Sequence, residues 1–204
     1  MVTTLYLMRH GEVHNPTQVL YGRMPNFYLS DTGIQQARAA GQWLQDKSIS
    51  AIYSSPMERA QQTAGIVAEY QDHLIPQIDE RIIEVHTPYD GRPTAELEAM
   101  GWDLYTGNEP PNEVPTGILE RVHDFFEYLI DEHHGESIVA VGHGDILVFP
   151  WLDAQGAVPT AAKKETLLDY NLPEPYPATA SIMTFTFNGS LRKSKPIVTY
   201  TRPY

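Results

Sequence analysis

Near its start the chain carries Thr4-Leu5-Tyr6-Leu7-Met8-Arg9-His10-Gly11-Glu12, an apolar run that passes directly into a charged turn. The apolar part has the length and composition of a buried strand. A second run of the same kind, Ser137 to Val141, passes into Gly142-His143-Gly144. Functional sites of open α/β sheets form at the carboxyl ends of the strands. If these two strands are neighbours, His10 and His143 therefore meet in one crevice.

Strand and helix patterns alternate along the rest of the chain. Further strands are predicted at 51–53, 75–78, 181–187 and 197–201, the last two flanking the hairpin signal Asn188-Gly189. Helices are predicted from Ser30 or Asp31 to Leu44, from the capping pair Ser55-Pro56 to about Tyr70, over 118–130, after Gly144 and within 161–170. The stretch 85–115 is rich in proline, glycine and acidic residues and predicts a loop with at most one short helix near 94–100.

This alternation predicts an α/β fold with a mostly parallel central sheet, helices on both faces and a late antiparallel hairpin. At 204 residues the chain is long enough for one sizeable core. No internal repeat or low-complexity tract divides the sequence. We therefore predict one domain over 1–204, with the stretch 85–115 as an insertion region.

Composition and charge exclude several functional classes. The formal net charge is −12, with only 14 lysines and arginines, so binding to nucleic acid or to anionic membranes is not expected. The sequence has no cysteine, which rules out disulfides, a thiol nucleophile and thiolate metal sites. It has no signal-peptide pattern and no apolar run of the roughly 20 residues that span a bilayer, so a cytoplasmic location is predicted.

Five side chains at or near predicted strand ends form a set that suits phosphoryl transfer: His10, His143, Arg9, Arg59 and Glu84. Each alone is an ordinary loop or helix residue. Together they provide a neutral imidazole to attack phosphorus, with arginines and a second imidazole to hold the phosphoryl oxygens. A carboxylic acid can protonate the leaving oxygen and then activate water. No metal and no cofactor are expected, because the cationic cluster offsets the phosphoryl charge.

In their order these motifs resemble the histidine phosphatase superfamily, also called phosphoglycerate mutase-like. The matching stretches spread over most of the chain and are Leu7 to Glu12, Tyr21-Gly22-Arg23, Leu29 to Gly33, Tyr53 to Ala64, Glu84, Val141 to Gly144 and Ala178 to Ile182. The resemblance implies a three-layer α/β/α sandwich. It also implies that His10 is the nucleophile, that Arg9, Arg59 and His143 bind the phosphoryl group, and that Glu84 is the proton donor.

Four more residues are expected near the substrate. The resemblance places Asn15 and Gly22 beside the phosphate. Arg23 and Gly144 lie within matching stretches and are expected to bind substrate. The segments 86–92 and 111–115 differ from the family's usual sequence where it recognises the rest of its substrate. The resemblance therefore does not name the alcohol that carries the phosphate.

Expectations also follow for two other sets of residues, the remaining cations and the aromatic residues of the later loops. The cations that could contact a substrate tail are Arg23, Arg92, Lys163 and Lys164, of which the two lysines are expected in solvent. The aromatic residues of the later loops are expected to pack on the core rather than to wall a pocket: Trp102, Tyr105, Trp151 and Tyr170.

Hydrolysis is favoured over two alternatives. A mutase must hold a second phosphate, yet the only Arg or Lys residues between Glu84 and His143 are Arg92 and Arg121. A non-catalytic phosphate-binding protein would be expected to lack part of the catalytic set, which is complete here. We therefore predict a metal-independent phosphatase of the histidine acid phosphatase type, acting on a small phosphorylated metabolite through a phosphohistidine. Mutase-type phosphoryl transfer and phosphate binding without catalysis are the alternatives.

Overall fold

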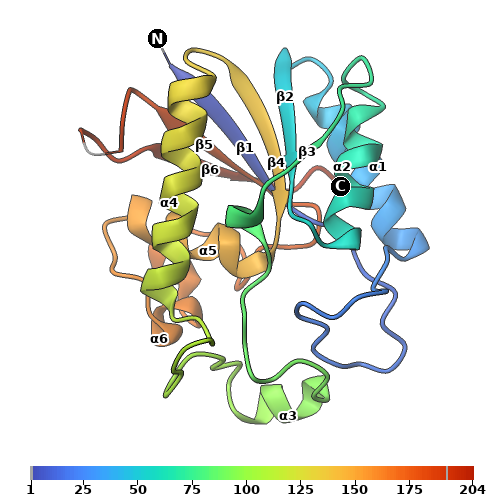
Figure 1. The fold of residues 1–204 in the computed structure, drawn as a ribbon, viewed down its shortest axis with the longest axis vertical. Helices are drawn as coiled ribbons and strands as arrows, with labels where there is room; N and C mark the ends of the chain where they lie inside the picture. The colour runs from blue at the N-terminus through green and yellow to red at the C-terminus, as the bar shows by residue number, and fades with distance from the viewer. Residues whose placement is uncertain (1, 192) are drawn as a thin grey trace.

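The computed structural model describes residues 2–191 and 193–204 and places a six-stranded sheet between two layers of helices (Figure 1). The strands are β1 (Thr3–Arg9), β2 (Ile49–Ser54), β3 (Gln77–Ile78), β4 (Ser137–Gly142), β5 (Ile182–Phe187) and β6 (Ile197–Thr201). They lie in the order β3-β2-β4-β1-β5-β6. Pairs among the first four are parallel, whereas β5 and β6 are antiparallel to their neighbours. The predicted α/β sandwich, with its mostly parallel sheet and late hairpin, is confirmed.

The helices cover both faces of this sheet. They are α1 (Asp31–Leu44), α2 (Glu58–Ala68), α3 (Thr94–Ala99), α4 (Pro115–Glu132), α5 (Gly144–Ala154) and α6 (Ala161–Lys164), with 3-10 turns at Glu80–Ile82 and Leu167–Tyr170. As predicted, α1 is capped by Ser30, whose hydroxyl accepts the backbone amide of Gly33. Helices α1 and α2 pack together on one face, and α4 and α5 on the other (Figure 1).

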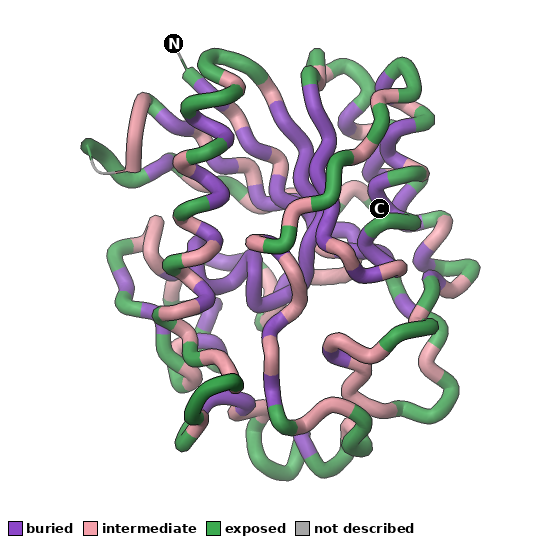
Figure 2. Tube along the Cα trace, in the orientation of Figure 1, coloured by how far each residue is buried: buried purple, intermediate pink, exposed green. Residues whose placement is uncertain are grey.

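Each face of the sheet has its own apolar core. In β1, Leu5 and Leu7 pack on the α4 and α5 side, whereas Met8 packs on the α1 and α2 side. In β4, Ala140 packs on the α4 and α5 side and Val139 on the α1 and α2 side. Successive side chains of a strand point to opposite faces, so one continuous apolar run supplies both cores. Figure 2 shows these strands as the buried centre of the molecule.

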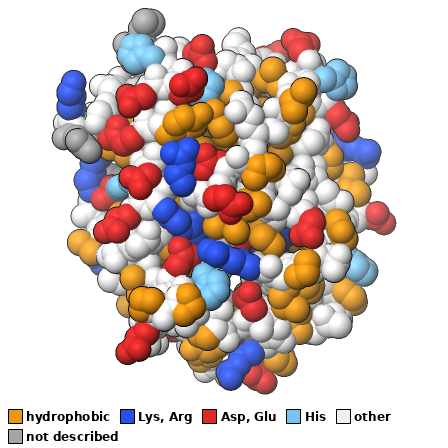
Figure 3. All heavy atoms as spheres, viewed as in Figure 1, with side chains coloured by type: hydrophobic (Ala, Val, Ile, Leu, Met, Phe, Trp, Pro, Cys, Tyr) orange, Lys and Arg blue, Asp and Glu red, His pale blue; other side chains and the backbone are white. Residues whose placement is uncertain are grey.

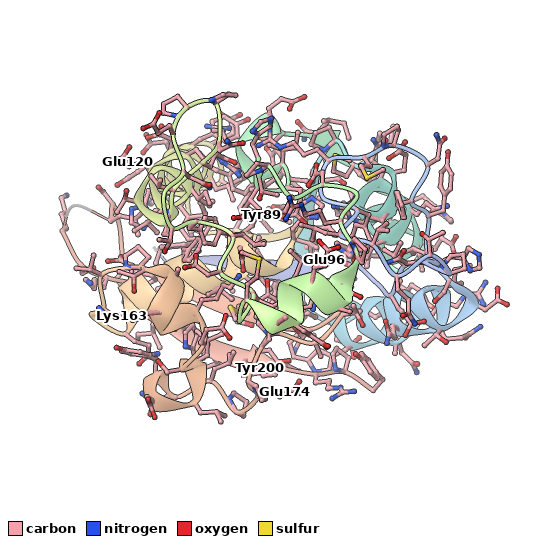
Figure 4. All side chains as sticks on the ribbon, turned by 90° about the horizontal axis from the view of Figure 1, so that it is seen from below. Tyr89, Glu96, Glu120, Lys163, Glu174 and Tyr200 are labelled. Carbon is pink, nitrogen blue, oxygen red and sulfur yellow. The ribbon has the colours of Figure 1, made fainter. Side chains whose placement is uncertain are left out.

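The register of the sheet brings the two histidine turns together. Strands β1 and β4 are parallel neighbours, with Arg9 opposite Gly142. The next residues, His10 and His143, therefore leave the same edge of the sheet side by side. In Figure 1 this edge faces down, toward α3 and the long loops. Figure 4 views the molecule from that end, with α3, which carries Glu96, in the foreground.

The structure differs from the predicted elements at three places. Helix α2 begins at Glu58 with Met57 at the cap position, rather than after a Ser55 cap. The Ser55 hydroxyl contacts the His143 ring and accepts the backbone amide of Met57. Strands β5 and β6 are joined by the segment 188–196 instead of a two-residue turn, since their ladder ends at the pair Thr186 and Ile197. The helix predicted within 161–170 is divided between α6 and a 3-10 turn.

Acidic side chains outnumber basic ones, with 26 Asp and Glu against 14 Lys and Arg. The two signs are interspersed on the face shown in Figure 3. Two cations, Arg59 and Lys164, are buried instead of lying on the surface. Over the described residues, no helix combines the length and the apolar composition needed to cross a bilayer.

Candidate active site

His10 lies in the turn after β1 and is almost fully buried. Its Nδ1 lies 2.7 Å from the carbonyl oxygen of Gly11. A carbonyl oxygen only accepts, so this contact places the imidazole proton on Nδ1 and the lone pair on Nε2. The backbone amide of Gly11 donates to Thr63 Oγ1 at 3.1 Å, which ties the turn to α2. The turn therefore presents Nε2 as a possible nucleophile.

Arg59, the second residue of α2, is fully buried between the other polar groups. Its Nε donates to His10 Nε2 at 3.2 Å, and its Nη2 donates to the carbonyl of Gly22 at 2.8 Å. The same Nη2 lies 3.3 Å from Glu84 Oε2 and 3.2 Å from His143 Nδ1. Among the described residues its Nη1 has no hydrogen-bond partner. A buried donor without a partner is costly, and a phosphoryl oxygen would supply that partner.

His143 precedes α5 and is fully buried beside His10, with the two ring centroids 5.3 Å apart. Its Nε2 lies 2.7 Å from Ser55 Oγ, and its Nδ1 lies 3.3 Å from Glu84 Oε2. The ring is therefore held from both sides. Its position at the start of α5 adds the partial positive charge of a helix N-terminus, which favours an anion.

Both imidazoles are held in the neutral form. Burial lowers the pKa of His10 well below its usual value of 6.5, and the charges of Arg59 and Arg9 lower it further. Burial and then Arg59 lower the pKa of His143 in the same direction. A neutral His10 keeps the lone pair that an attack on phosphorus requires.

The pKa of Glu84 is shifted in the direction opposite to that of the two histidines. Burial raises the pKa of its carboxyl group, although the charge of Arg59 opposes the shift. Its Oε1 accepts the backbone amide of Val85 at 2.8 Å, which leaves Oε2 facing Arg59 and His143. A carboxyl group with a raised pKa keeps its proton to higher pH and can serve as a general acid.

Arg9, the last residue of β1, supplies a second cation. Its Nη1 donates to the carbonyl of Pro177 at 2.6 Å, and its guanidinium carbon lies 5.2 Å from the centre of the Tyr176 ring. The Tyr176 hydroxyl donates to Asp145 Oδ1 at 2.6 Å. The loop that contains Tyr176 and Pro177 therefore orients Arg9 directly, and Asp145 acts on Arg9 through Tyr176.

A cavity of about 500 Å³ opens over these groups. Its wall includes Arg9, His10 and Glu84, together with apolar side chains from the loops. This volume is typical of a pocket that takes a small molecule. The five side chains predicted to carry the chemistry thus lie together at one edge of the sheet, against a cavity.

Three of the four other predicted residues line the cavity: Asn15, Gly22 and Gly144. The Asn15 amide is occupied locally, because its Nδ2 donates to the carbonyl of Val19 at 2.9 Å. Gly22 has a positive φ of 37°, and a Cβ there would lie 1.8 Å from the Asp90 carboxylate. Only glycine can therefore present the carbonyl that accepts Arg59.

Arg23 is not among the residues that line the cavity. Its Nε donates to the carbonyl of Glu84 at 2.7 Å, and its Nη2 pairs with Glu113 at 3.0 Å. Arg23 thus holds the backbone of the proposed acid in place. Its direct contact with substrate stays a prediction.

Several residues of the site carry no recognisable sequence signal. Asp145 is a buried residue of the cavity wall and accepts hydrogen bonds from Tyr105, Tyr176 and Lys164. The expectation that Lys164 lies in solvent is wrong, because its side chain is 5% exposed and pairs with Asp145 at 3.3 Å. The expectation for Trp102 is wrong in part, since this residue lines the cavity.

The same cluster has donor atoms that could face a metal ion. Ligand atoms of His10, Glu84 and His143 lie within 4.8 Å of one another. The guanidinium of Arg59, however, donates to His10 Nε2 and lies 3.2 Å from His143 Nδ1. A fixed cation therefore faces the lone pairs that a metal would need, and repulsion between the two charges disfavours a metal at this point.

Comparison with known proteins places this site in a family context. Residues 5–170 match the histidine phosphatase superfamily (branch 1). The chain is 47% identical over 90 residues to an uncharacterised protein of Mycobacterium tuberculosis, covering 44% of each chain. It is 34% identical over 146 residues to the fructose-2,6-bisphosphatase TIGAR of Xenopus laevis, covering 66% of this chain and 52% of that protein. The chain thus spans about half the length of these curated relatives.

The fold has counterparts among solved structures. One is phosphoserine phosphatase from Entamoeba histolytica in complex with 3-phosphoglyceric acid, with a TM-score of 0.74. The superposition covers 97% of this chain and 95% of that one at 24% identity. At this identity the likeness establishes the shared fold and nothing finer.

Proposed function

The chain belongs to the histidine phosphatase superfamily, and from that premise we propose that it hydrolyses phosphate monoesters of small molecules through a phosphohistidine on His10. One observation carries the proposal. His10 Nε2, with its lone pair free of a proton, lies 3.2 Å from the buried Arg59 and beside a carboxyl group whose pKa is raised. A nucleophile, a fixed cation and an acid in one cavity are what phosphoryl transfer through histidine needs.

In the first step His10 Nε2 attacks phosphorus and the bond from phosphorus to the ester oxygen breaks. Glu84, protonated beforehand, passes its proton to the leaving oxygen, so an alcohol departs. Arg59 and Arg9 offset the charge on the equatorial phosphoryl oxygens, and His143 completes the binding site. The products are phosphohistidine, free alcohol and the Glu84 carboxylate.

In the second step a water molecule attacks the phosphohistidine. The Glu84 carboxylate accepts a proton from that water, and the bond between His10 Nε2 and phosphorus breaks. Inorganic phosphate leaves, while neutral His10 and protonated Glu84 are restored. The buried environment that lowers the pKa of His10 also favours its return to the neutral form.

One relative named above supports the substrate class, because TIGAR is named for a phosphorylated sugar. A cavity of about 500 Å³ suits substrates of that size better than a phosphorylated protein segment. We therefore assign a small phosphorylated molecule as the substrate.

A partition experiment tests the shared intermediate. Wild-type protein is given several phosphomonoesters in excess chelator, with methanol present to compete with water for the phosphoryl group. Every ester passes through the same phosphohistidine, so the ratio of methyl phosphate to inorganic phosphate should not depend on the ester. A ratio that changes with the leaving group, or activity that needs added magnesium, would contradict the proposed mechanism.

Replacing Glu84 with glutamine should affect esters according to their leaving group. We expect kcat to fall by about 10²- to 10⁴-fold for an alkyl phosphate, and by less for an aryl phosphate whose phenolate leaves without a proton. The Glu80→Gln variant, at an exposed position, serves as the control. Equal losses for both esters would mean that Glu84 is not the acid.

The pH profile of the Glu84 variant gives a second readout. The reaction needs neutral His10 and protonated Glu84. Activity on alkyl esters should therefore fall at low pH, where His10 gains a proton below its lowered pKa, and at high pH, where Glu84 loses one above its raised pKa. Glu84→Gln should remove the high-pH limb and keep the low-pH limb. Measuring kcat/KM across pH checks both statements.

Ser55 is expected to position His143. Ser55→Ala removes the hydroxyl that lies 2.7 Å from His143 Nε2 and also accepts the Met57 amide at 3.3 Å. We expect kcat/KM to fall about tenfold, the effect of losing the hydrogen bond to His143. Ser54→Ala is the matched control, because this neighbouring buried hydroxyl donates only to the Ser55 carbonyl, at 2.9 Å. An equal loss in both variants would assign the effect to the turn and not to His143.

A further inference from the structure

The cavity wall offers little positive charge beyond the proposed phosphoryl site. Its described lining residues include two cations, Arg9 and Lys164, and three carboxylates, Glu84, Asp145 and Glu165. Arg9 belongs to the phosphoryl site at the end of β1. Lys164 is therefore the one lining cation, among the described residues, that could meet another part of the substrate.

The charge of Lys164 is already balanced by the protein. Its Nζ lies 3.3 Å from Asp145 Oδ2 and donates to the carbonyl of Trp102 at 3.1 Å. It also lies 5.2 Å from the centre of the Tyr105 ring. The next residue, Glu165, adds a negative charge to the same wall. A second phosphate placed here would meet an ion pair and a carboxylate instead of a free cation.

Two nearby arginines, Arg23 in a loop and Arg121 on α4, do not change this balance. Arg23 and Arg121 both pair with Glu113, at 3.0 Å and 2.7 Å. Neither of them lines the cavity. Their charges are therefore shared with a carboxylate outside the space that a substrate would fill.

The rest of the wall is mostly apolar. It includes the side chains of Val19, Leu20, Val85, Trp102 and Leu104. The neutral polar residues of this wall include Asn15, Tyr21, Thr87 and Thr94. Asn15 donates its amide nitrogen to the Val19 carbonyl, Thr87 Oγ1 accepts the Tyr89 amide, and the Tyr21 ring lies against Arg59 at the phosphoryl site. Apolar walls with few free polar groups select ligands by burying apolar surface, and they penalise hydroxyl groups that lose water without gaining a partner.

On the basis of the proposed function, we infer that the substrate is a monophosphate ester of an uncharged alcohol with an apolar body. The phosphate lies at His10 and Arg59, and the apolar body lies against Trp102 and Leu104. Esters with a second phosphate are rejected because the part of the wall formed by described residues offers that phosphate no free cation. Polyhydroxylated alcohols bind less well because the wall beyond the phosphoryl site is mostly apolar and its Asp145 carboxylate is already bonded by Tyr105, Tyr176 and Lys164.

Three esters of primary alcohols separate these features. Pentyl phosphate, ribose 5-phosphate and pentane-1,5-diol bisphosphate have carbon skeletons of similar length and alkoxide leaving groups of one kind. We expect kcat/KM for pentyl phosphate to exceed both others by about tenfold or more, the discrimination that a hydrophobic pocket gives. A preference for ribose 5-phosphate or for the bisphosphate would overturn the inference.

Two substitutions test the wall itself. Trp102→Ala should reduce the ratio of kcat/KM for pentyl phosphate to that for methyl phosphate by about tenfold. Trp43→Ala, on α1 and away from the cavity, should leave this ratio unchanged. Glu165→Lys should raise kcat/KM for the bisphosphate relative to pentyl phosphate, whereas Glu69→Lys, an equal charge change on exposed surface, should not. Equal effects of target and control variants would overturn the assignment of this wall.

Different results would contradict the proposed function and the inference about the alcohol. If no ester releases phosphate, or if release persists in His10→Ala, the proposed function is wrong. If release depends on His10 but favours the bisphosphate or the sugar phosphate, the proposed function stands and the inference about the alcohol is wrong.

Discussion

Replacing His10 with alanine should reduce phosphate release to background, a loss of at least ~10⁴-fold in kcat. The expected loss is large because His10 is the one imidazole among the described residues that line the cavity, whereas His143 lies behind it. His143 Nδ1 faces Arg59 and Glu84, and its Nε2 faces Ser55. The remaining cations can still bind phosphate, so inorganic phosphate should continue to bind to the variant.

Two controls show whether phosphate release by His10→Ala is lost because the nucleophile is missing or because the protein unfolds. His134→Ala, at an exposed position, is the matched control and should retain wild-type activity. Thermal unfolding of His10→Ala should remain cooperative. Rapid quenching should trap a phosphoenzyme whose phosphate is labile in acid and stable in alkali, in wild type and not in the variant. Turnover by His10→Ala within tenfold of wild type would exclude His10 as the nucleophile.

The central part of the site was predictable because its positions follow from strand chemistry. The apolar runs before His10 and His143 specify buried strands, and buried parallel strands end at a common edge. The structure places Arg9 opposite Gly142, as neighbouring strands require. The helix that carries Arg59 follows β2 at the same edge. Motif and topology therefore indicate the same residues.

The supporting residues could not be predicted for a different physical reason. Asp145, Tyr105, Tyr176 and Lys164 come from four separate segments and meet only through tertiary packing. A lysine in a polar stretch is expected in water, and only the buried Asp145 carboxylate makes its burial favourable. Ser55 has the sequence of a helix cap, yet its hydroxyl is used by His143 across the sheet edge. Local patterns do not report such long-range partners.

Replacing Arg59 should also cause a large loss of kcat/KM, and the loss should differ between replacement with lysine and replacement with glutamine. Arg59→Lys keeps a positive charge but loses the fork that reaches His10, Gly22 and Glu84. Arg59→Gln loses the charge as well. We expect kcat/KM to fall by about 10²- to 10³-fold for lysine and further for glutamine, since both weaken the stabilisation of phosphoryl charge.

The pH profile distinguishes charge from geometry at Arg59. The guanidinium lowers the pKa of His10 and opposes the rise in the pKa of Glu84, so its removal should raise both pKa values. In Arg59→Gln both limbs of the kcat/KM profile should therefore move to higher pH, whereas in Arg59→Lys they should move less. Arg38→Gln, on the exposed side of α1, is the control for charge alone. Limbs that stay in place in Arg59→Gln would show that Arg59 does not set the protonation of the nucleophile and the acid, and would leave burial as the cause of both shifts.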